Sequence, residues 1–413
     1  MGKRTNEGDS TVVMKRRGGV VGATFACPRE LHGLGGPAGT RTWLGRSLSE
    51  RVEWAFLESG IAFVGSETPD ESLGRFMVRE DVVLTRDAVE AFAEFAGDQD
   101  LAFEPQGRLA NFIADLSFGD EGPWLVYLAP GGAATEARIR EAKPVEVDPK
   151  ERMLSFPLSE EHHGAAAVEL PISDRLVMPT WHWLQLVWAN LLGLGPFLWR
   201  GLMGRNIIEV LFRGLFAVLR AGSLKPQRIG AKLGRRGKRC RIHPSAVVEG
   251  CWLEDDVEIG ANAVVRGCVL GHGVVIEDLA MVEFSVLDAG ARVQRQAMVK
   301  FSTLGRGAAV GGLMQLGTLD RHAALKRTGV LMDVSFGQSV SVVVDGDRRP
   351  APLAMAGCCI GERSTVGAGV QVAAGRSVPA GVTIVAGRNS TVVRIPEDID
   401  GLTRISDGTL ERI

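Results

Sequence analysis

The sequence predicts an α/β N-terminal domain followed by a hydrophobic helical connector and an all-β, left-handed parallel β-helix. Three observations support this fold class: strand and helix patterns alternate before residue 130, residues 176–199 carry no charged side chain, and aliphatic residues recur every 17 positions from residue 253. We place a flexible tail at 1–19, the α/β domain at 20–175, the connector at 176–235, the β-helix at 236–395 and a C-terminal tail at 396–413.

The composition of the 413 residues excludes several protein classes. Hydrophobic residues make up 45% and charged residues 23%, so the chain is not wholly disordered. The formal net charge of −2 gives no global basis for binding nucleic acid, and we expect no such partner. Six cysteines are too few for a disulfide framework, which favours a reducing compartment and predicts a cytoplasmic protein.

Two interpretations remain open for the start of the chain. Met14 begins a basic stretch, and the small apolar run 18–26 leads to Cys27, as in a lipoprotein signal. The same apolar run is also consistent with the first β-strand of the fold. Translation from Met1 and from Met14 are both compatible with the sequence.

The α/β domain is predicted from short elements in alternation. Apolar side chains recur at helical spacing over 47–59 after a serine cap, and Gly60 ends that helix. Strands are expected at 61–64, 82–84 and 124–128, with a second helix running from Thr85 to about Phe95.

The connector has two interpretations. Residues 176–199 contain four tryptophans, and Gly193 and Pro196 predict a break in their helix. A second apolar segment follows at 207–219, and twelve lysines or arginines but one acid lie between 200 and 241. Segment 176–241 is therefore expected either to lie on an anionic membrane, at the inner face, or to be a buried connector between the domains.

The C-terminal half is a hexapeptide repeat. Six-residue sides made of a strand and a turn close a triangular coil, and stacked coils bury one aliphatic column per side. The predicted columns are Leu253, Leu270, Leu287 and Leu304; Ile259, Ile276, Val293 and Val310; and Val265, Val282, Val299 and Leu316. The six-residue spacing resumes at Ile360, Val366, Val372, Val378 and Ile384.

The same period predicts which side chains stack on neighbouring coils, about 4.8 Å apart. One predicted column alternates in charge: Glu249, Arg266, Glu283 and Lys300. A column of small residues contains Cys251 and Cys268, which are expected to be reduced thiols, with a disulfide or metal site as the alternative.

One segment of the repeat resembles a known family. Residues 296–317, Q-A-M-V-K-F-S-T-L-G-R-G-A-A-V-G-G-L-M-Q-L-G, are similar to the acetyltransferase half of the bifunctional N-acetylglucosamine-1-phosphate uridylyltransferases. The resemblance implies that Lys300 binds a substrate phosphate, unless it only pairs with Glu283. It also implies a homotrimer, with acetyl-CoA or a nucleotide sugar as the cofactor or donor.

The family's catalytic chemistry is not retained at the matching positions. The catalytic histidine of the family corresponds to Gly312, and its substrate-contacting tyrosine corresponds to Gln315. Without a general base, acetyl transfer slows by about 10²–10⁴-fold. His322 is the candidate to replace the missing base, and no metal site is expected.

The N-terminal domain is similar in element order to a nucleotidyltransferase domain. In that family a Gly-rich basic loop after the first strand cradles the triphosphate, whereas Gly39-Thr40-Arg41 is displaced here and no P-K motif follows. We therefore expect a reduced nucleotidyltransferase-like domain.

Two functions of different classes follow. One is a transferase acting on a sugar phosphate or an acyl-thioester at the edge of the β-helix, with Arg348 and Arg349 of the irregular stretch 314–357 as further phosphate ligands. The other is a catalytically inactive scaffold or regulatory homologue at a membrane surface.

Overall fold

The fold is seen in a computed structural model. It describes residues 20–27, 34, 37–66, 70–119, 122–157, 167–204, 207–222, 229, 233–335, 339–390, 403–407 and 409–412. The tail expected at 1–19, and residues 396–402 of the C-terminal tail, lie outside these residues. Within the second tail, β38 (Thr403–Ser406) and β39 (Thr409–Arg412) pair as a hairpin.

A six-stranded mixed sheet forms the centre of the N-terminal domain. Its order is β4 (Ala62–Phe63), β1 (Val20–Phe25), β5 (Gly74–Arg79), β8 (Leu125–Leu128), β7 (Leu101–Pro105) and β9 (Lys143–Val147). The apolar run after Met14 thus forms the strand β1, parallel to both of its neighbours. Beside this sheet lie the short pair β12 (Val177–Pro179) and β6 (Val82–Leu84) and the hairpin β10 (Arg152–Pro157) and β11 (Ala167–Ile172).

Helices cover both faces of this sheet. On one face, α1 (Leu48–Glu58) and α2 (Arg86–Phe92) bury Phe56, Phe76 and Phe92 in a common core. On the other face, α4 (Glu136–Arg140) packs Ile139 on Val126 and its neighbours. The helix expected to reach Phe95 ends at Phe92, and α3 (Gly107–Ser117) was not expected from the sequence.

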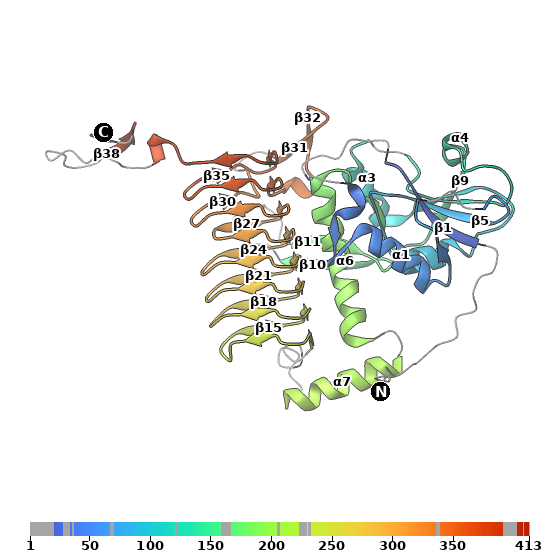
Figure 1. The fold of residues 1–413 in the computed structure, drawn as a ribbon, viewed down its shortest axis with the longest axis horizontal. Coiled ribbons are helices and arrows are strands. Elements are labelled where there is room, and N and C mark those ends of the chain that lie inside the picture. The colour runs from blue at the N-terminus through green and yellow to red at the C-terminus, as the bar shows by residue number, and fades with distance from the viewer. Residues whose placement is uncertain are drawn as a thin grey trace, which may run out of the picture.

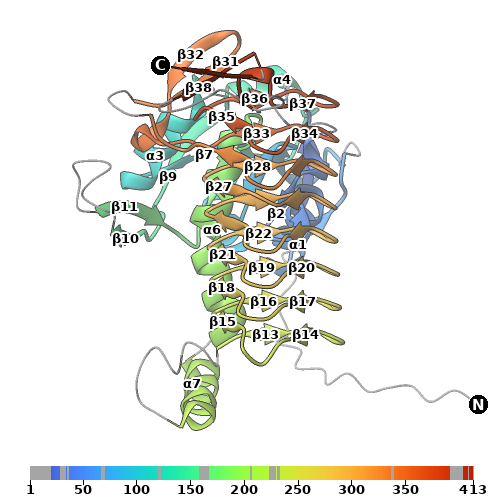
Figure 2. The same cartoon turned by 90° about the vertical axis from the view of Figure 1, so that its left-hand side faces the viewer.

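Three parallel sheets stacked as coils form the C-terminal domain, which confirms the predicted β-helix (Figures 1 and 2). We call these sheets face 1, face 2 and face 3. Face 1 consists of β13 (Arg235–Arg236), β16 (Trp252–Leu253), β19 (Val269–Leu270), β22 (Val286–Leu287), β25 (Thr303–Leu304), β28 (Thr318–Leu319), β33 (Cys359–Ile360) and β36 (Ser377–Val378). Face 2 consists of β14 (Arg241–Ile242), β17 (Glu258–Ile259), β20 (Val275–Ile276), β23 (Arg292–Val293), β26 (Ala309–Val310), β29 (Ala324–Leu325), β34 (Thr365–Val366) and β37 (Thr383–Ile384). Face 3 consists of β15 (Val247–Glu249), β18 (Val264–Arg266), β21 (Met281–Glu283), β24 (Met298–Lys300), β27 (Leu313–Gln315), β30 (Val330–Leu331) and β35 (Gln371–Val372).

The aliphatic columns point inward as predicted, with one correction. The coil that begins at Thr303 has 15 residues instead of 17, since Thr303 pairs in register with Thr318. Met314 therefore stacks on Val299, whereas Leu316 was predicted at that position. Leu316 lies at the following turn, with a φ of +51°, and packs outside the coil interior.

The predicted side-chain stacks are present. Along face 3, the Arg266 guanidinium forms ion pairs with two carboxylates: its Nε is 2.9 Å from Glu249 Oε2, and its Nη1 is 3.2 Å from Glu283 Oε1. Cys251 and Cys268 are buried free thiols, and burial raises the pKa of Cys268. Among the described residues, no three His, Cys, Asp or Glu side chains are grouped so that they could hold a metal ion.

The helix α6 (Trp183–Met203) settles the interpretation of 176–199. It lies between the α/β domain and face 1 (Figure 1), and its side chains, with Trp183, Trp188 and Leu192 among them, share one core with Val269 and Val286 of face 1. Most of this part of the connector is therefore buried, and Trp199 at its end is exposed. No helix in the described ranges is long and apolar enough to span a bilayer.

The expected break at Gly193 and Pro196 does not occur, because α6 continues through both residues. Close packing explains this. A Cβ on Gly193 would lie 2.9 Å from the Trp43 ring, so the absence of a side chain lets the N-terminal domain contact the helix backbone. Tertiary contacts of this kind outweigh the local helix-breaking tendency of Pro196.

The repeat is interrupted at 332–358, not from 314 as the sequence suggested. This insertion carries β31 (Ser341–Val344), β32 (Asp347–Pro350) and the 3₁₀ turn η2 (Pro352–Ala354). Val340, Val342 and Val344 join the core around α6, and the His182 ring nitrogen Nε2 lies 3.2 Å from the Val343 carbonyl oxygen. The insertion thus packs against the core around α6 and joins the β-helix to the α/β domain.

Face 1 is covered by the rest of the same chain, which limits how copies of the β-helix can associate. Face 3 keeps an outward column with Met281, Met298 and Leu313, of which Leu313 is exposed. The homotrimer expected from the family resemblance would have to use faces 2 and 3, and it stays a prediction.

Candidate functional site

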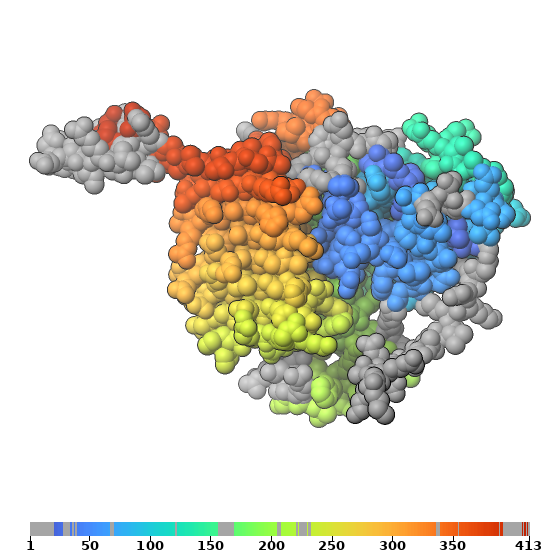
Figure 3. Space-filling model, viewed as in Figure 1, coloured from blue at the N-terminus to red at the C-terminus, as the bar shows by residue number. Residues whose placement is uncertain are grey.

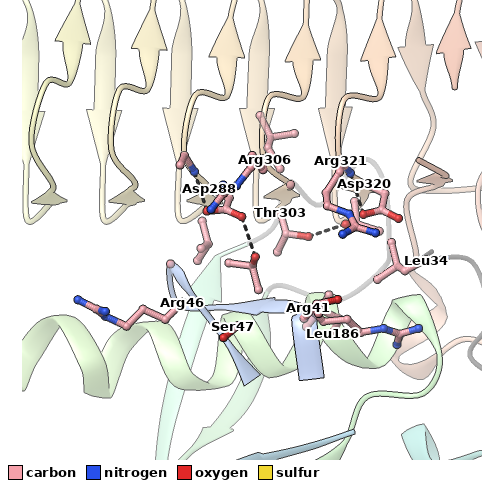
Figure 4. Close-up of a pocket in the computed structure, with 18 of the residues that line it drawn as sticks. Leu34, Arg41, Arg46, Ser47, Leu186, Asp288, Thr303, Arg306, Asp320 and Arg321 are labelled. Carbon is pink, nitrogen blue, oxygen red and sulfur yellow. Dashed lines mark hydrogen bonds between the residues drawn. The ribbon is translucent and has the colours of Figure 1, made fainter. Parts of the chain in front are cut away.

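A cavity of about 750 Å³ lies between face 1 and the start of the α/β domain (Figure 4). Figure 4 shows Arg41, Arg46 and Ser47 on the N-terminal side, and Asp288 and Arg321 on the β-helix side. The polar lining residues include Thr40, Arg41, Thr42, Arg46, Ser47, Ser49, Glu50, Glu254, His272, Asp288, Thr303, Arg306, Thr318, Asp320 and Arg321.

The N-terminal wall is a short hairpin held firmly by α6. After the 3₁₀ turn η1 (Ala38–Thr40), β2 (Thr42–Trp43) and β3 (Arg46–Ser47) pair around Leu44 and Gly45. The Trp43 indole N–H donates to the Ala189 carbonyl at 3.0 Å, and the Leu44 N–H donates to the Asn190 side-chain oxygen at 2.9 Å. A buried helix therefore fixes the position of this wall.

The first turn of α1 reaches the same cavity. Ser47 accepts from the Glu50 N–H at 3.3 Å, and the Glu50 carboxylate accepts from the Ser47 N–H at 2.9 Å. These hydrogen bonds from Ser47 hold the pKa of Glu50 below its usual range. Glu50 is thus a fixed carboxylate, already engaged by its own helix cap.

Arg41 is the unusual residue of this site. Its side chain is buried, with 5% of its surface exposed, and one guanidinium nitrogen donates to the Thr180 carbonyl. Among the residues that the structure describes, the other two nitrogens, Nε and Nη2, have no hydrogen-bond partner. Burial lowers the pKa of Arg41, and the charge of Asp81 opposes that shift. An N–H group buried without a partner is costly, so this guanidinium is suited to receive an anion.

The β-helix wall comes from outward positions of face 1. Val269 and Val286 pack on α6, but the next two coils carry Thr303 and Thr318 at the same register, joined by a 2.7 Å hydrogen bond. This outward column of face 1 thus changes from valine to threonine where the cavity separates the N-terminal domain from the coils. This change leaves a polar floor for the cavity.

The acidic groups of this wall already have partners. Asp288 accepts from the Thr42 hydroxyl at 2.8 Å, which links the two domains, and from the Ala289 N–H at 2.6 Å. Asp320 accepts from the Arg321 N–H at 2.7 Å. These hydrogen bonds fix the position of both carboxylates, which keep their negative charge.

The basic groups at the rim differ in how far they are engaged. Arg321 pairs with Glu362 at 3.0 Å. Arg46 and Arg306 are exposed, and in the described part of the chain neither makes an ion pair. Arg46 and Arg306 thus give the cavity two exposed cationic groups with unused N–H donors, and Arg41 adds a third cation whose unpartnered nitrogens are buried.

Lys300 lies elsewhere, on β24 of face 3. Its ammonium group is 3.0 Å from Glu283, and the two residues also pair in register. Burial by itself would raise the pKa of Glu283, but hydrogen bonds and charge from Lys300 and Arg266 outweigh it and lower that pKa. Lys300 therefore completes the charged column of face 3.

The other sequence candidates are also separate from Lys300. His322 is an exposed turn residue between faces 1 and 2, with a φ of +57°, while Arg348 and Arg349 are exposed on β32. None of the four lines the interdomain cavity. The structure does not bring them together, because consecutive sides of a coil face different directions.

The position of the family's catalytic histidine has no room for a side chain. Gly312 is buried, and a Cβ there would clash with the Gly329 carbonyl oxygen and lie 2.9 Å from its carbonyl carbon. Gln315 sits beside Lys300 in the face 3 register and offers no base. The corner that carries acetyl transfer in the family therefore lacks that chemistry here.

We expect Lys300→Ala to leave ligand binding unchanged and to alter the free energy of unfolding by less than about 1 kcal/mol, because partly exposed ion pairs contribute little. Urea denaturation and titration calorimetry with acetyl-CoA and sugar phosphates would measure both quantities. A large loss of affinity in this variant would return the phosphate site to face 3.

Sequence reasoning missed most of the cavity, although two signals were present. Gly39-Thr40-Arg41 was noticed as a displaced motif, and Arg41 proves to line the site. The change from valine to threonine along the face 1 column was the second signal. Neither shows from sequence alone that two segments more than 240 residues apart share one cavity.

Comparison with known proteins yields structural neighbours only. No protein-family model matches the chain, and no curated protein matches it. The acetyltransferase domain of PglB from Neisseria gonorrhoeae aligns at 18% identity over 27% of this chain and 54% of that chain, with a TM-score of 0.18. The same domain in complex with acetyl coenzyme A aligns at 16% identity over 29% and 57%, also with a TM-score of 0.18. The matches span about half of the neisserial domain, and similarity this low transfers neither its activity nor its ligand to the chain.

Proposed function

We propose that the chain is a transferase of the lineage its hexapeptide motif resembles, and that it binds a phosphate-bearing substrate in the interdomain cavity. The observation that carries this proposal is Arg41, a buried guanidinium with two nitrogens that lack a partner. A phosphate oxygen accepts from such a fork in a charge-assisted hydrogen bond.

The free hydrogen-bond donors of the cavity support an anionic ligand, while its formal charges balance, since four arginines and four carboxylates (Glu50, Glu254, Asp288 and Asp320) line it. Glu50 and Asp288 are engaged by hydrogen bonds within the walls, whereas Arg46 and Arg306 have unused donors. A phosphate entering the cavity would therefore meet cationic donors without having to displace an existing ion pair.

The size of the cavity limits the substrate class. A volume of about 750 Å³ falls within the usual range of small-molecule sites, about 300–1,000 Å³. Sugar phosphates, nucleotide sugars and the nucleotide part of acetyl-CoA are compatible with this volume. For the transfer step itself, the cavity offers an imidazole, His272, as a group able to move a proton.

The second candidate is an inactive scaffold that keeps the fold and a ligand site. The crowded backbone at Gly312 favours it, since the acetyl-transfer corner of the family cannot hold its base. The two candidates separate on turnover: a transferase releases a modified sugar or free coenzyme A, and a scaffold only binds.

The test is titration calorimetry of the parent with UDP-N-acetylglucosamine, N-acetylglucosamine 1-phosphate and acetyl-CoA, followed by mass spectrometry for products. We expect at least one of these ligands to bind, and the double variant Arg46→Met/Arg306→Met to bind it roughly five- to thirtyfold more weakly. Arg140→Met, an exposed arginine on α4, is the matched control and should bind like the parent.

Two results would contradict the proposal. If the parent binds none of the three ligands, the cavity is not a phosphate site. If the double variant and the control bind equally well, the ligand lies elsewhere on the protein.

A further inference from the structure

The helix α7 (Ile207–Ala221) carries an apolar face that the described part of the chain leaves exposed. Five large side chains recur at helical spacing on one side: Ile208 at 75% exposed, Leu211 at 66%, Phe212 at 71%, Leu215 at 59% and Leu219 at 69%. Their spacing of three and four residues places them on a single stripe. A stripe of this size is rare on a monomeric surface unless it binds something.

The opposite side of α7 attaches the helix to the end of α6. Ala217 is buried, and a Cβ on Gly214 would be 3.8 Å from the Met203 methyl group. The Arg213 guanidinium donates to the carbonyl oxygen of Gly201 at 3.0 Å. The helix is therefore held in place with its apolar stripe directed outward.

The helix lies at one end of the molecule. Figures 1 and 2 show it below α6 and the first coil of the β-helix, away from the α/β sheet, and Figure 3 shows the β-helix packed beside the α/β domain above that end. A flat surface could therefore reach α7 without meeting the α/β domain first.

The sequence around the stripe is strongly basic. Residues 205–232 hold six lysines or arginines and one acid, Glu209. Two copies meeting through this stripe would bring these like charges together, whereas an anionic bilayer would complement them. The charge therefore favours a membrane surface over a second copy of the chain.

We propose that α7 lies in the interface of an anionic bilayer, with its apolar stripe among the acyl chains and its basic flanks among the headgroups. Fifteen residues of helix span about 22 Å, too short to cross the hydrocarbon core, so the helix lies parallel to the surface. This assigns membrane contact to α7 and removes it from 183–194, which is almost entirely buried. The inference does not depend on the ligand proposed for the cavity.

The test is co-sedimentation of the full chain with vesicles of phosphatidylcholine mixed equally with phosphatidylglycerol. We expect the parent to pellet with these vesicles, to bind less well as salt is raised, and to ignore vesicles of phosphatidylcholine alone. Phe212→Glu and Leu215→Glu should each weaken binding by roughly tenfold or more, because each removes a large apolar side chain from the interface.

Val385→Glu is the matched control, since Val385 is 73% exposed at the far end of the β-helix. It should bind vesicles like the parent, and all three variants should keep the parent's circular dichroism because the altered residues are exposed. Failure of the parent to bind anionic vesicles would overturn the proposal. So would equal binding by the α7 variants, or a dimer in light scattering that Phe212→Glu converts to a monomer without vesicle binding by the parent.

Discussion

Arg41→Met is expected to abolish binding of the phosphate-bearing ligand and at the same time to stabilise the free protein. Removing a buried cation from a charge-assisted contact costs about 2–5 kcal/mol of binding, which corresponds to at least about a thirtyfold loss of affinity. In the free protein the guanidinium is 5% exposed and two of its nitrogens have no partner. Methionine fills similar volume without that desolvation cost, so the expected net gain in unfolding free energy is about 1–3 kcal/mol after loss of the Thr180 hydrogen bond.

This prediction is measured by titration calorimetry and urea denaturation on the same samples. Arg140→Met again serves as the control, since that arginine is exposed in an i,i+4 pair on α4 and should change neither quantity by much. Opposite signs for stability and affinity distinguish a ligand-binding arginine from a structural one. If Arg41→Met lowers stability and leaves affinity unchanged, Arg41 holds the fold instead.

Gly312→His, which restores the family's catalytic residue, is expected to disrupt the coil and to yield no acetyl transfer. A Cβ at this position meets backbone atoms of Gly329, including a nitrogen at 3.1 Å, and backbone cannot move aside as a flexible side chain can. The Leu313 N–H also donates to the Gly329 carbonyl at 3.0 Å, so the coils would have to separate there. We expect a loss of at least about 3 kcal/mol in unfolding free energy.

Thermal denaturation and an acetyl-CoA hydrolysis assay measure this outcome. Gly312→Ala should already lose most of the stability, because the first carbon atom creates the clash. Gly387→Ala is the control, since a Cβ there meets no atom within 4 Å. A Gly312→His protein that melts like the parent and transfers acetyl groups would show that the turn can relax.

The β-helix was predictable because its signal is local and repeated. Each side of a coil places one aliphatic residue inward at a fixed spacing, so Leu253 and Ile259 predict the same geometry as the residues that follow them in the repeat. The error at Leu316 arose where one coil is shorter, and a fixed period cannot register such a change. The helix at 48–58 was predictable for a similar reason, since Ser47 and Glu50 form its cap from neighbouring positions.

The connector and the site were harder because they depend on contacts between distant segments. The uncharged run 176–199 is compatible with a membrane and with a protein core. Trp188 is buried in protein because face 1, which is distant in the sequence, packs against its helix. In the sequence Arg41 is only part of a weak motif. Its distinguishing feature is that two buried guanidinium nitrogens lack hydrogen-bond partners among the described residues, and a sequence motif cannot show this. Thr42 and Asp288 are 246 residues apart, and no spacing rule links them.

The buried position of α6 has a consequence for how the chain is synthesised. The helix leaves the ribosome complete at Met203, but face 1 is finished only at β36 (Ser377–Val378), and Cys359 in the strand before it also contributes to the core around α6. At about 5–20 residues per second, this leaves the tryptophan-rich helix without its β-helix partner for roughly ten to thirty seconds. During that interval the apolar side chains of the helix are exposed, and we expect chaperones to bind the nascent chain. The α/β domain completes its core around α6 only after the coils of the β-helix have formed.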